Sequence, residues 1–307
     1  MKIYKNLHCN RLLSLRNICY NKDSVFGVRR KEKMEKFLTD VHNHSAHSHD
    51  GKALLSEMLA EAQKKGVMFY GVSEHFDYSV TEVRPETKEL FGINEEVYFH
   101  EARPLQEDYA GVMNVLVGAE FDFSYDKRAE NSYLEAYEKY RPDFIVNSVH
   151  THQSYDYYYT AKDEKRPKSV VYREYLKYVR NSLDVPYPYD IVGHIGYITR
   201  YACYEDKRMT LDEFGTEIDD ILLTIIKKDK ILEINSSNKS GVSPFLPSGE
   251  IIERYYELGG RKVSYGSDAH TPDRILDKRE DVVALLKRIG FTYITVPCKG
   301  EHIKVEI

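Results

Sequence analysis

The 307-residue sequence has no tryptophan, no CxxC cysteine pair and no apolar run long enough to cross a membrane. A bilayer-spanning helix needs about 20 apolar residues, so we expect no membrane segment. The four cysteines, Cys9, Cys19, Cys203 and Cys298, are scattered, which predicts reduced thiols in a cytosolic protein rather than a disulfide framework or zinc knuckle. The net charge of −5 leaves no basic excess, so we expect no nucleic-acid partner.

The remaining composition is that of an ordinary globular protein, with 42% hydrophobic and 30% charged residues. This length fits one large domain or two small ones. Residues 1–33 are rich in Lys and Arg and lack the apolar core of a secretory signal. We interpret them as an N-terminal extension that is disordered or outside the fold, with residues 34–307 forming one barrel domain.

A histidine-rich tract follows the first strand-like run, residues 37–41. In an extended chain, residues two apart point to the same face, so His42 and His44 can bind one metal ion. Asp50 ends the tract, and His47 and His49 lie between. Most of these side chains require water, a partner or a metal. On its own, the tract is equally compatible with a solvated surface segment that binds metal only incidentally.

Strand-like and helix-like segments alternate through the rest of the chain. We expect strands at 67–73, 114–119, 143–149, 189–193, 231–235, 262–267 and 293–296, and helices at 53–65, 130–140, 169–182, 250–258 and 282–289. A further helix follows a capping box made by Thr210 and Glu213. We interpret 78–106 as an excursion over one end of the fold and 151–168 as a long loop.

Seven or eight strands alternating with helices predict an α/β fold with parallel βαβ units. No glycine-rich phosphate loop follows the first strand, which disfavours an open doubly wound sheet. In a closed barrel, the carboxyl ends of all strands meet at one mouth. The residues at these ends are His42 and His44, Glu74 and His75, Glu120, His150, His194, and Asp268 and His270. The pattern therefore predicts a metal site at the C-terminal ends of the strands.

Histidine and carboxylate ligands together suit zinc, iron or manganese. About nine ligands, at roughly four or five per ion, suffice for two or three divalent ions. Closely spaced ions lower the pKa of a bound water and stabilise the oxygens of an in-line phosphoryl displacement. This chemistry favours hydrolysis of a small-molecule phosphate ester.

The motifs resemble those of the polymerase-and-histidinol-phosphatase (PHP) family, and most closely its monofunctional histidinol-phosphate phosphatases. They are Asp-x-His-x-His-Ser at residues 40–45 with Asp50, Glu74-His75, Gly118-Ala119-Glu120, Ser148-Val149-His150, Gly193-His194-Ile195 and Gly266-Ser267-Asp268-Ala269-His270. The resemblance spans about residues 37–296. It implies a distorted (β/α)7 TIM-like barrel with a trinuclear metal site.

The resemblance also implies which residues hold each metal. The first would be bound by His42, His44, Glu120 and Asp268, the second by Glu120, His150 and His194, and the third by Asp50, His75 and His270. His47 and His49 would lie outside the site. Two departures from the family pattern are Glu74, where the family usually has Asp, and Gly196, where it usually has Asp after Gly-His-Ile.

Arg200 follows His194 by six residues and resembles the family's arginine after its Gly-His motif, so it is the candidate phosphate-binding residue. A guanidinium offers a planar fork of donors to phosphoryl oxygens. Arg274 is a second candidate, and Tyr155 could meet the cationic part of the substrate. Together with the resemblance, this predicts dephosphorylation of L-histidinol phosphate in histidine biosynthesis, with His270 assisting the departing alkoxide. The alternatives are a PHP phosphoesterase for a sugar phosphate, nucleotide or phosphotyrosine, and a non-catalytic metal-binding module.

Overall fold

A computed structural model describes residues 38–78, 93–152, 155–238 and 241–307. The predicted extension at 1–33 lies outside the described residues. Seven strands form one sheet in which every neighbouring pair is parallel. In spatial order they are β1 (Leu38–Asp40), β2 (Val67–Phe76), β3 (Asn114–Asp122), β4 (Ile145–Ser148), β7 (Ile191–Val192), β8 (Ile231–Asn235) and β9 (Val263–Gly266).

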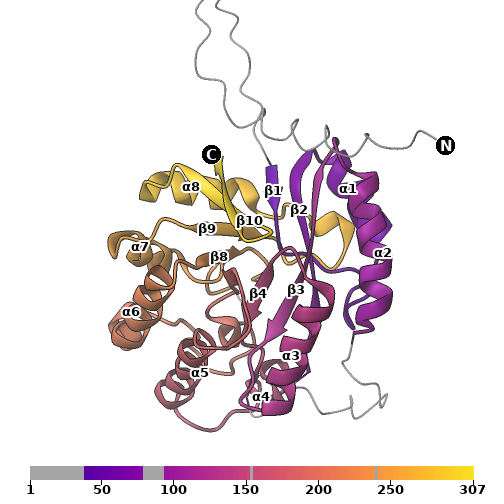
Figure 1. Cartoon of the computed structure of the whole chain (residues 1–307). Helices are drawn as coiled ribbons and strands as arrows, with labels where there is room; N and C mark the ends of the chain where they lie inside the picture. Colours follow the sequence, from indigo (N-terminus) through magenta and orange to yellow (C-terminus); the bar gives the residue numbers. More distant parts are fainter. Residues whose placement is uncertain (1–37, 79–92, 153–154, 239–240) are drawn as a thin grey trace, which may run out of the picture. The chain divides into compact units, whose positions relative to one another are not determined.

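The helices pack around the outside of these strands (Figure 1). They are α1 (Leu55–Lys64), α2 (Glu95–Asp108), α3 (Lys127–Tyr140), α5 (Lys168–Ser182), α6 (Leu211–Lys227), α7 (Gly249–Glu257) and α8 (Arg279–Ile289). In the part of the chain described, no helix has the length and apolar character required to span a membrane. The alternation of strand and helix confirms the predicted distorted (β/α)7 TIM-like barrel.

Helix α6 illustrates how local sequence specifies these elements. Thr210 Oγ1 accepts a hydrogen bond from the backbone N of Glu213 (3.4 Å), which is the N-cap half of the predicted capping box. The Glu213 carboxylate pairs with Lys168 (2.5 Å). Phe214, Ile218 and Ile225 recur on one face and are fully buried. Each such side chain contributes about 1.5–3 kcal/mol through removal from water, so the apolar stripe holds the helix against the sheet.

The segment after β1 closes the barrel against the end of β9. The backbone N of Val41 donates to Tyr265 O (3.2 Å), Asp268 N donates to His42 O (2.8 Å), and His44 N donates to Ala269 O (2.9 Å). These bonds tie the two edges of the sheet together where the predicted ligands lie. Closure therefore fixes His42 and His44 relative to Asp268.

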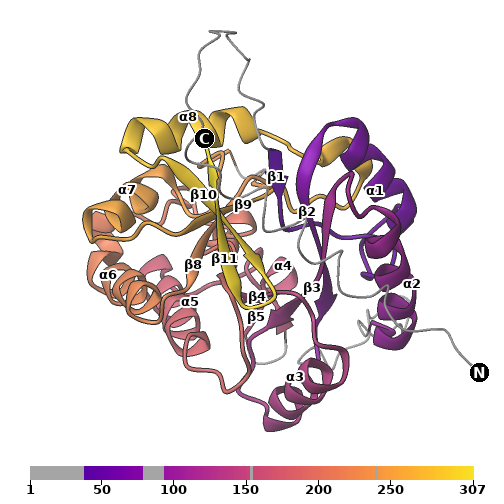
Figure 2. The same ribbon diagram turned by 45° about the horizontal axis from the view of Figure 1, so that its top comes forward.

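A terminal hairpin, β10 (Tyr293–Cys298) and β11 (Glu301–Glu306), covers the opposite end of the barrel (Figure 2). Lys299 N donates to Asp143 O just before β4 (2.8 Å), and Lys262, just before β9, lies 2.8 Å from His302. Apolar side chains of the barrel pack together with two valines of the hairpin, Val296 and Val305, in one cluster. Its members are Val41, Leu116, Phe144, Val146, Ile191, Ile231, Val296 and Val305.

Three segments differ from the sequence prediction. The strand predicted at 293–296 is half of this antiparallel hairpin, not a further parallel strand. The predicted loop at 151–168 contains a short hairpin, β5 (Thr151–His152) and β6 (Tyr155–Asp156), and the one-turn helix α4 (Tyr157–Thr160). Within the predicted excursion at 78–106, α2 is a 14-residue helix that continues through Pro104, while 79–92 lies outside the described residues.

Candidate metal centre

The barrel gathers all nine predicted ligands at one mouth, although they come from separate strands. His42 and His44 follow β1, His75 lies in β2, Glu120 in β3, His150 follows β4, His194 follows β7, and Asp268 and His270 follow β9. Asp50 lies in the loop after β1. Six of the nine line a cavity of about 230 Å³. Its lining residues are Asp50, His75, His150, His194, Tyr197, Arg200, Tyr201, Ser237, Asp268 and His270.

The first group joins His42, His44, Glu120 and Asp268. The Nε2 atoms of the two histidines are 3.1 Å apart. Glu120 Oε2 lies 3.4 Å from His42 Nε2 and 3.6 Å from His44 Nε2, and Asp268 Oδ1 lies 3.9 Å and 3.3 Å from the same two atoms. Ligand atoms bound at about 2.0–2.2 Å around a tetrahedral ion are separated by distances of this order.

The second group shares Glu120 with the first. Glu120 Oε1 lies 2.9 Å from His194 Nε2 and 3.2 Å from His150 Nε2, and these two nitrogens are 3.2 Å apart. Ser148 Oγ donates to the same carboxylate oxygen (2.6 Å). Glu120 therefore presents one oxygen to each of the first two groups, as a bridging carboxylate does.

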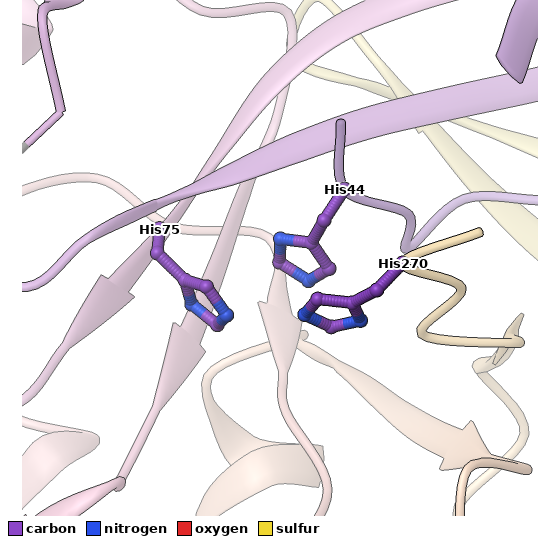
Figure 3. A group of neighbouring side chains, drawn as sticks. All are labelled: His44, His75 and His270. Carbon is purple, nitrogen blue, oxygen red and sulfur yellow. The ribbon is translucent and has the colours of Figure 1, made fainter. Parts of the chain in front are cut away.

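The third group contains Asp50, His75 and His270. Asp50 Oδ2 lies 3.0 Å from His270 Nε2, and Asp50 Oδ1 lies 3.6 Å from His75 Nε2. Figure 3 shows the rings of His75 and His270 on either side of His44, which stacks 4.2 Å from the first and 4.3 Å from the second. The His75 Nδ1 atom lies 2.8 Å from Glu120 Oε2, so this group adjoins the bridging carboxylate.

Several atoms of the predicted ligands are buried close to oppositely charged groups but make no well-aligned hydrogen bond among the described residues. These atoms are Asp50 Oδ1, His75 Nδ1, Glu120 Oε2 and His270 Nε2. A buried polar atom without a partner costs roughly 1–3 kcal/mol, and a divalent cation would satisfy these lone pairs. The donor set of imidazole and carboxylate groups therefore fits bound zinc, manganese or iron.

Charge coupling among these groups is strong. Burial alone would raise the pKa of Glu120, but His150, His42 and His75 hold the pKa of this carboxyl well below its ordinary value. Burial opposes protonation of His75, yet Glu120, Asp77 and Asp50 raise its pKa to about 10. The carboxylates thus favour positive charge on His75, and a divalent cation supplies positive charge at the same place.

Other polar side chains orient the ligands, and sequence inspection did not identify them. Glu233 Oε1 lies 2.5 Å from His42 Nδ1. Ser48 Oγ lies 3.2 Å from His44 Nδ1, and Asp77 Oδ1 lies 3.4 Å from His150 Nδ1. Contacts at Nδ1 leave Nε2 directed into the cluster. An isolated Glu in an apolar strand, or a Ser in a polar loop, has no sequence signature for this role.

Glu74 stands where the PHP family usually has Asp, and it fixes the loop after β1. Its carboxylate accepts from Ser45 N (3.0 Å), Ser45 Oγ (2.5 Å) and Ser48 Oγ (2.5 Å). Ser48 Oγ in turn accepts from the backbone N of His75 (3.0 Å). Glu74 thus acts on the backbone of His75 through Ser48.

Arg200 lies at the cavity in the 3-10 helix η2 (Tyr197–Arg200). Its Nη2 donates to Asn235 Oδ1 (2.8 Å) and Asp268 Oδ2 (3.2 Å), and its guanidinium lies 5.1 Å from the Tyr197 ring centroid. Its buried Nε has no partner in the described part of the chain. Arg200 therefore retains a donor for a ligand.

The structure does not bring the other two substrate-binding candidates to the cavity. Arg274, in η3 (Pro272–Arg274), pairs with Asp277 (2.6 Å) three residues later. Tyr155 is 49% exposed in β6. Neither residue lines the cavity, whereas Tyr197 and Tyr201 do.

The two histidines left out of the predicted site also lie outside the three ligand groups. His47 is directed to α2, where its Nε2 lies 2.9 Å from Glu101 Oε2. His49 is exposed, with its ring 5.4 Å from that of His75.

Comparisons with known proteins agree with this arrangement. The PHP domain model matches residues 40–237, more than half of the chain. A probable histidinol-phosphatase of Clostridium acetobutylicum is 30% identical over 238 residues, covering 77% of this chain and 88% of the relative. The histidinol-phosphatase of Lactococcus lactis is 26% identical over 255 residues, covering 82% and 91%.

A solved structure gives the same result at the level of the fold. The histidinol phosphate phosphatase of L. lactis, crystallised with zinc, L-histidinol and phosphate, superposes with a TM-score of 0.76 at 25% identity. The similarity covers 87% of this chain and 99% of that structure. Asp268 and His270 lie beyond the segment matched by the domain model, but the barrel brings them to the other seven ligands. The chain therefore belongs to the PHP domain family.

Proposed function

We propose that this protein is a metal-dependent histidinol-phosphatase, hydrolysing L-histidinol phosphate to L-histidinol and phosphate in histidine biosynthesis. The observation that carries the proposal is the convergence of nine ligand-type side chains at one mouth of the barrel, where six of them and Arg200 line one small cavity. Relatives named as histidinol-phosphatases, and the L. lactis structure with histidinol and phosphate, support the choice of substrate. This biosynthetic role corresponds to a proposed cytoplasmic location.

Three ligand groups would hold the metals. They are His42, His44, Glu120 and Asp268; then Glu120, His150 and His194; then Asp50, His75 and His270. When bound, divalent ions of zinc, manganese or iron would activate water and neutralise charge on the phosphoryl group. The zinc in the L. lactis structure supports this assignment.

The chain's own residues contribute binding and orientation. Arg200 is fixed by Asn235 and Asp268, and its unpartnered Nε would donate to a phosphoryl oxygen. Tyr197 and Tyr201, whose ring centroids are 5.3 Å apart, form an aromatic wall beside it. Such a wall suits a leaving group that carries an imidazole and an ammonium. The cavity of about 230 Å³ is at the small end for ligand sites, as expected for a small metabolite.

We propose His270 as a metal ligand rather than as a free acid. Its Nδ1 lies 3.0 Å from the carbonyl O of Asp268, and donation there leaves the Nε2 lone pair directed at Asp50 and the cluster. Proton donation by His270 to the departing alkoxide is therefore the less favoured of its two predicted roles.

A second candidate is a phosphoesterase of the same family with another substrate. It is supported by a relative of Thermoanaerobacter named only as a probable phosphatase, which is 26% identical over 262 residues. The ligand groups would serve both reactions, so only the substrate distinguishes them.

Complementation of a histidine auxotroph that lacks its histidinol-phosphatase tests the proposal. Expression of the wild-type chain is expected to restore growth without histidine, because the block lies at this single hydrolysis. The His194→Ala variant, which removes a predicted ligand from Glu120 Oε1, should not restore growth. Absence of growth with well-expressed wild-type protein would favour the second candidate.

A further inference from the structure

Strand β8 differs from its neighbours because its end supplies no predicted ligand. It carries two buried polar side chains instead, Glu233 (1% exposed) and Asn235 (0% exposed). Both are directed at residues of the site. Burial of a carboxylate costs free energy unless both of its oxygens accept hydrogen bonds. The contacts of Glu233 therefore indicate its role.

Each oxygen of Glu233 contacts a different predicted ligand. Oε1 lies 2.5 Å from His42 Nδ1, and Oε2 accepts from the backbone N of His194 (2.6 Å). His42 belongs to the first ligand group, and His194 belongs to the second. One carboxylate therefore contacts both ligand groups, at His42 Nδ1 and at the backbone of His194 rather than at the Nε2 atoms of the cluster.

The two contacts require two acceptors. For His42 Nε2 to present a lone pair to the cluster, Nδ1 must carry the proton and donate it. The backbone N–H of His194 is also a donor. A carboxylate satisfies both, whereas the isosteric amide of glutamine offers one acceptor and one donor. If the glutamine NH2 faces His42, that imidazole must move its proton to Nε2, the atom directed at the cluster.

A glycine in β9 leaves the space for this pair. A Cβ placed on Gly266 would lie 2.5 Å from Glu233 Oε1 and 2.6 Å from His42 Cβ. Both distances are shorter than ordinary contacts, and both neighbours are held in place. β9 can therefore lie beside the Glu233–His42 contact only because residue 266 has no side chain.

We propose that Glu233 is a positioning residue that fixes the tautomer and orientation of His42 and the backbone of His194, so that the first two metal positions form together. The inference rests on the metal-binding part of the proposed function. It does not depend on which phosphate ester is hydrolysed.

The test compares Glu233→Gln with Asp143→Asn. Asp143 is a matched control because it is also a buried carboxylate that accepts from a backbone N–H, that of Val117 (2.9 Å). It lies just before β4, at the opposite end of the barrel. Zinc affinity is measured by competition with a chromophoric chelator, zinc stoichiometry by elemental analysis, and the stability of the metal-free protein by urea unfolding.

We expect Glu233→Gln to bind zinc about 10- to 100-fold more weakly, the usual effect of losing a partner behind a ligand. Asp143→Asn should lose stability but keep wild-type zinc affinity. The inference is overturned if Glu233→Gln binds zinc as the wild type does, or if both variants lose affinity only in proportion to lost stability. If the Gln variant does not fold, Glu233→Asp decides, since its shorter carboxylate cannot span both contacts: weakened zinc binding supports the inference, and unchanged binding overturns it.

The readout separates this inference from the proposed function. Wild-type protein that binds zinc but does not hydrolyse histidinol phosphate would defeat the proposed function alone. Wild-type zinc binding by Glu233→Gln in an active phosphatase would defeat this inference alone.

Discussion

Replacement of Arg200 by alanine should weaken transition-state binding without removing metal. Arg200 Nη2 is engaged by Asn235 and Asp268, while its buried Nε lacks a partner in the described structure. One charge-assisted hydrogen bond to a phosphoryl oxygen is worth about 1.5–3 kcal/mol, which corresponds to a loss of about 10- to 150-fold in kcat/KM. The kcat/KM of Arg200→Lys should lie between those of the wild type and Arg200→Ala, because an ammonium keeps the positive charge but lacks the planar fork of donors.

Metal content should stay unchanged in Arg200→Ala. The guanidinium lies 3.2 Å from Asp268 Oδ2. Its removal takes a positive charge away from a predicted ligand, so electrostatic repulsion toward a metal cation does not increase. The assay is kcat/KM for release of phosphate from L-histidinol phosphate, with zinc measured on the same samples.

Arg274→Ala is the matched control for this experiment. It removes the same side chain a short distance after His270, but from a residue that pairs with Asp277 outside the cavity. Its kcat/KM should remain within about twofold of wild type, because a partly exposed ion pair contributes about 0–1 kcal/mol. Equal losses in the two variants, or loss of zinc in Arg200→Ala, would refute the reasoning.

Three further predictions concern metal, packing and the barrel interior. Dialysis against a chelator should abolish phosphate release. Zinc restored to 100 times its Kd should add about 2.7 kcal/mol to the free energy of unfolding, which raises the melting temperature by roughly 5–10 °C in calorimetry. An unchanged melting temperature would contradict the metal site. Gly193→Ala would place a Cβ 2.3 Å from Ser148 Oγ, which donates to Glu120. This variant should retain less zinc in elemental analysis. Gly215→Ala is the control, because a Cβ there meets no atom within 4 Å, and its zinc content should equal that of the wild type. Phe144→Ala, inside the barrel, should cost about 3–5 kcal/mol in urea unfolding while zinc per folded chain is unchanged; loss of zinc there would indicate that the barrel interior shapes the site directly.

The strand ends could be predicted because each carries its own local pattern. An apolar run followed by His, Glu or Asp indicates both the strand and the point where it stops, and parallel topology brings such points together. His75 and Glu120 follow this rule even though β2 and β3 continue through them. The eight predicted ligands at strand ends therefore come together in the structure, whereas Asp50, in the loop after β1, is predicted from the resemblance.

Other features depend on contacts that the local sequence does not encode. Glu233 is distinguished only by its contacts with His42, 191 positions away, and with His194, 39 positions away. The β10–β11 hairpin turns at Lys299 and Gly300, which both have positive φ; lysine is a weak signal for such a turn compared with Asn or Asp. Arg274 follows a predicted ligand, His270, as Arg200 follows His194, but the fold brings only Arg200 to the cavity.

Steady-state phosphate release by zinc- or manganese-loaded protein tests the central claim most directly. The assay compares L-histidinol phosphate with a sugar phosphate, a nucleotide and phosphotyrosine, each with and without chelator. We predict chelator-sensitive turnover with the highest kcat/KM for L-histidinol phosphate. Equal or higher kcat/KM for another ester would contradict the substrate assignment, and full activity in the presence of chelator would contradict the metal centre.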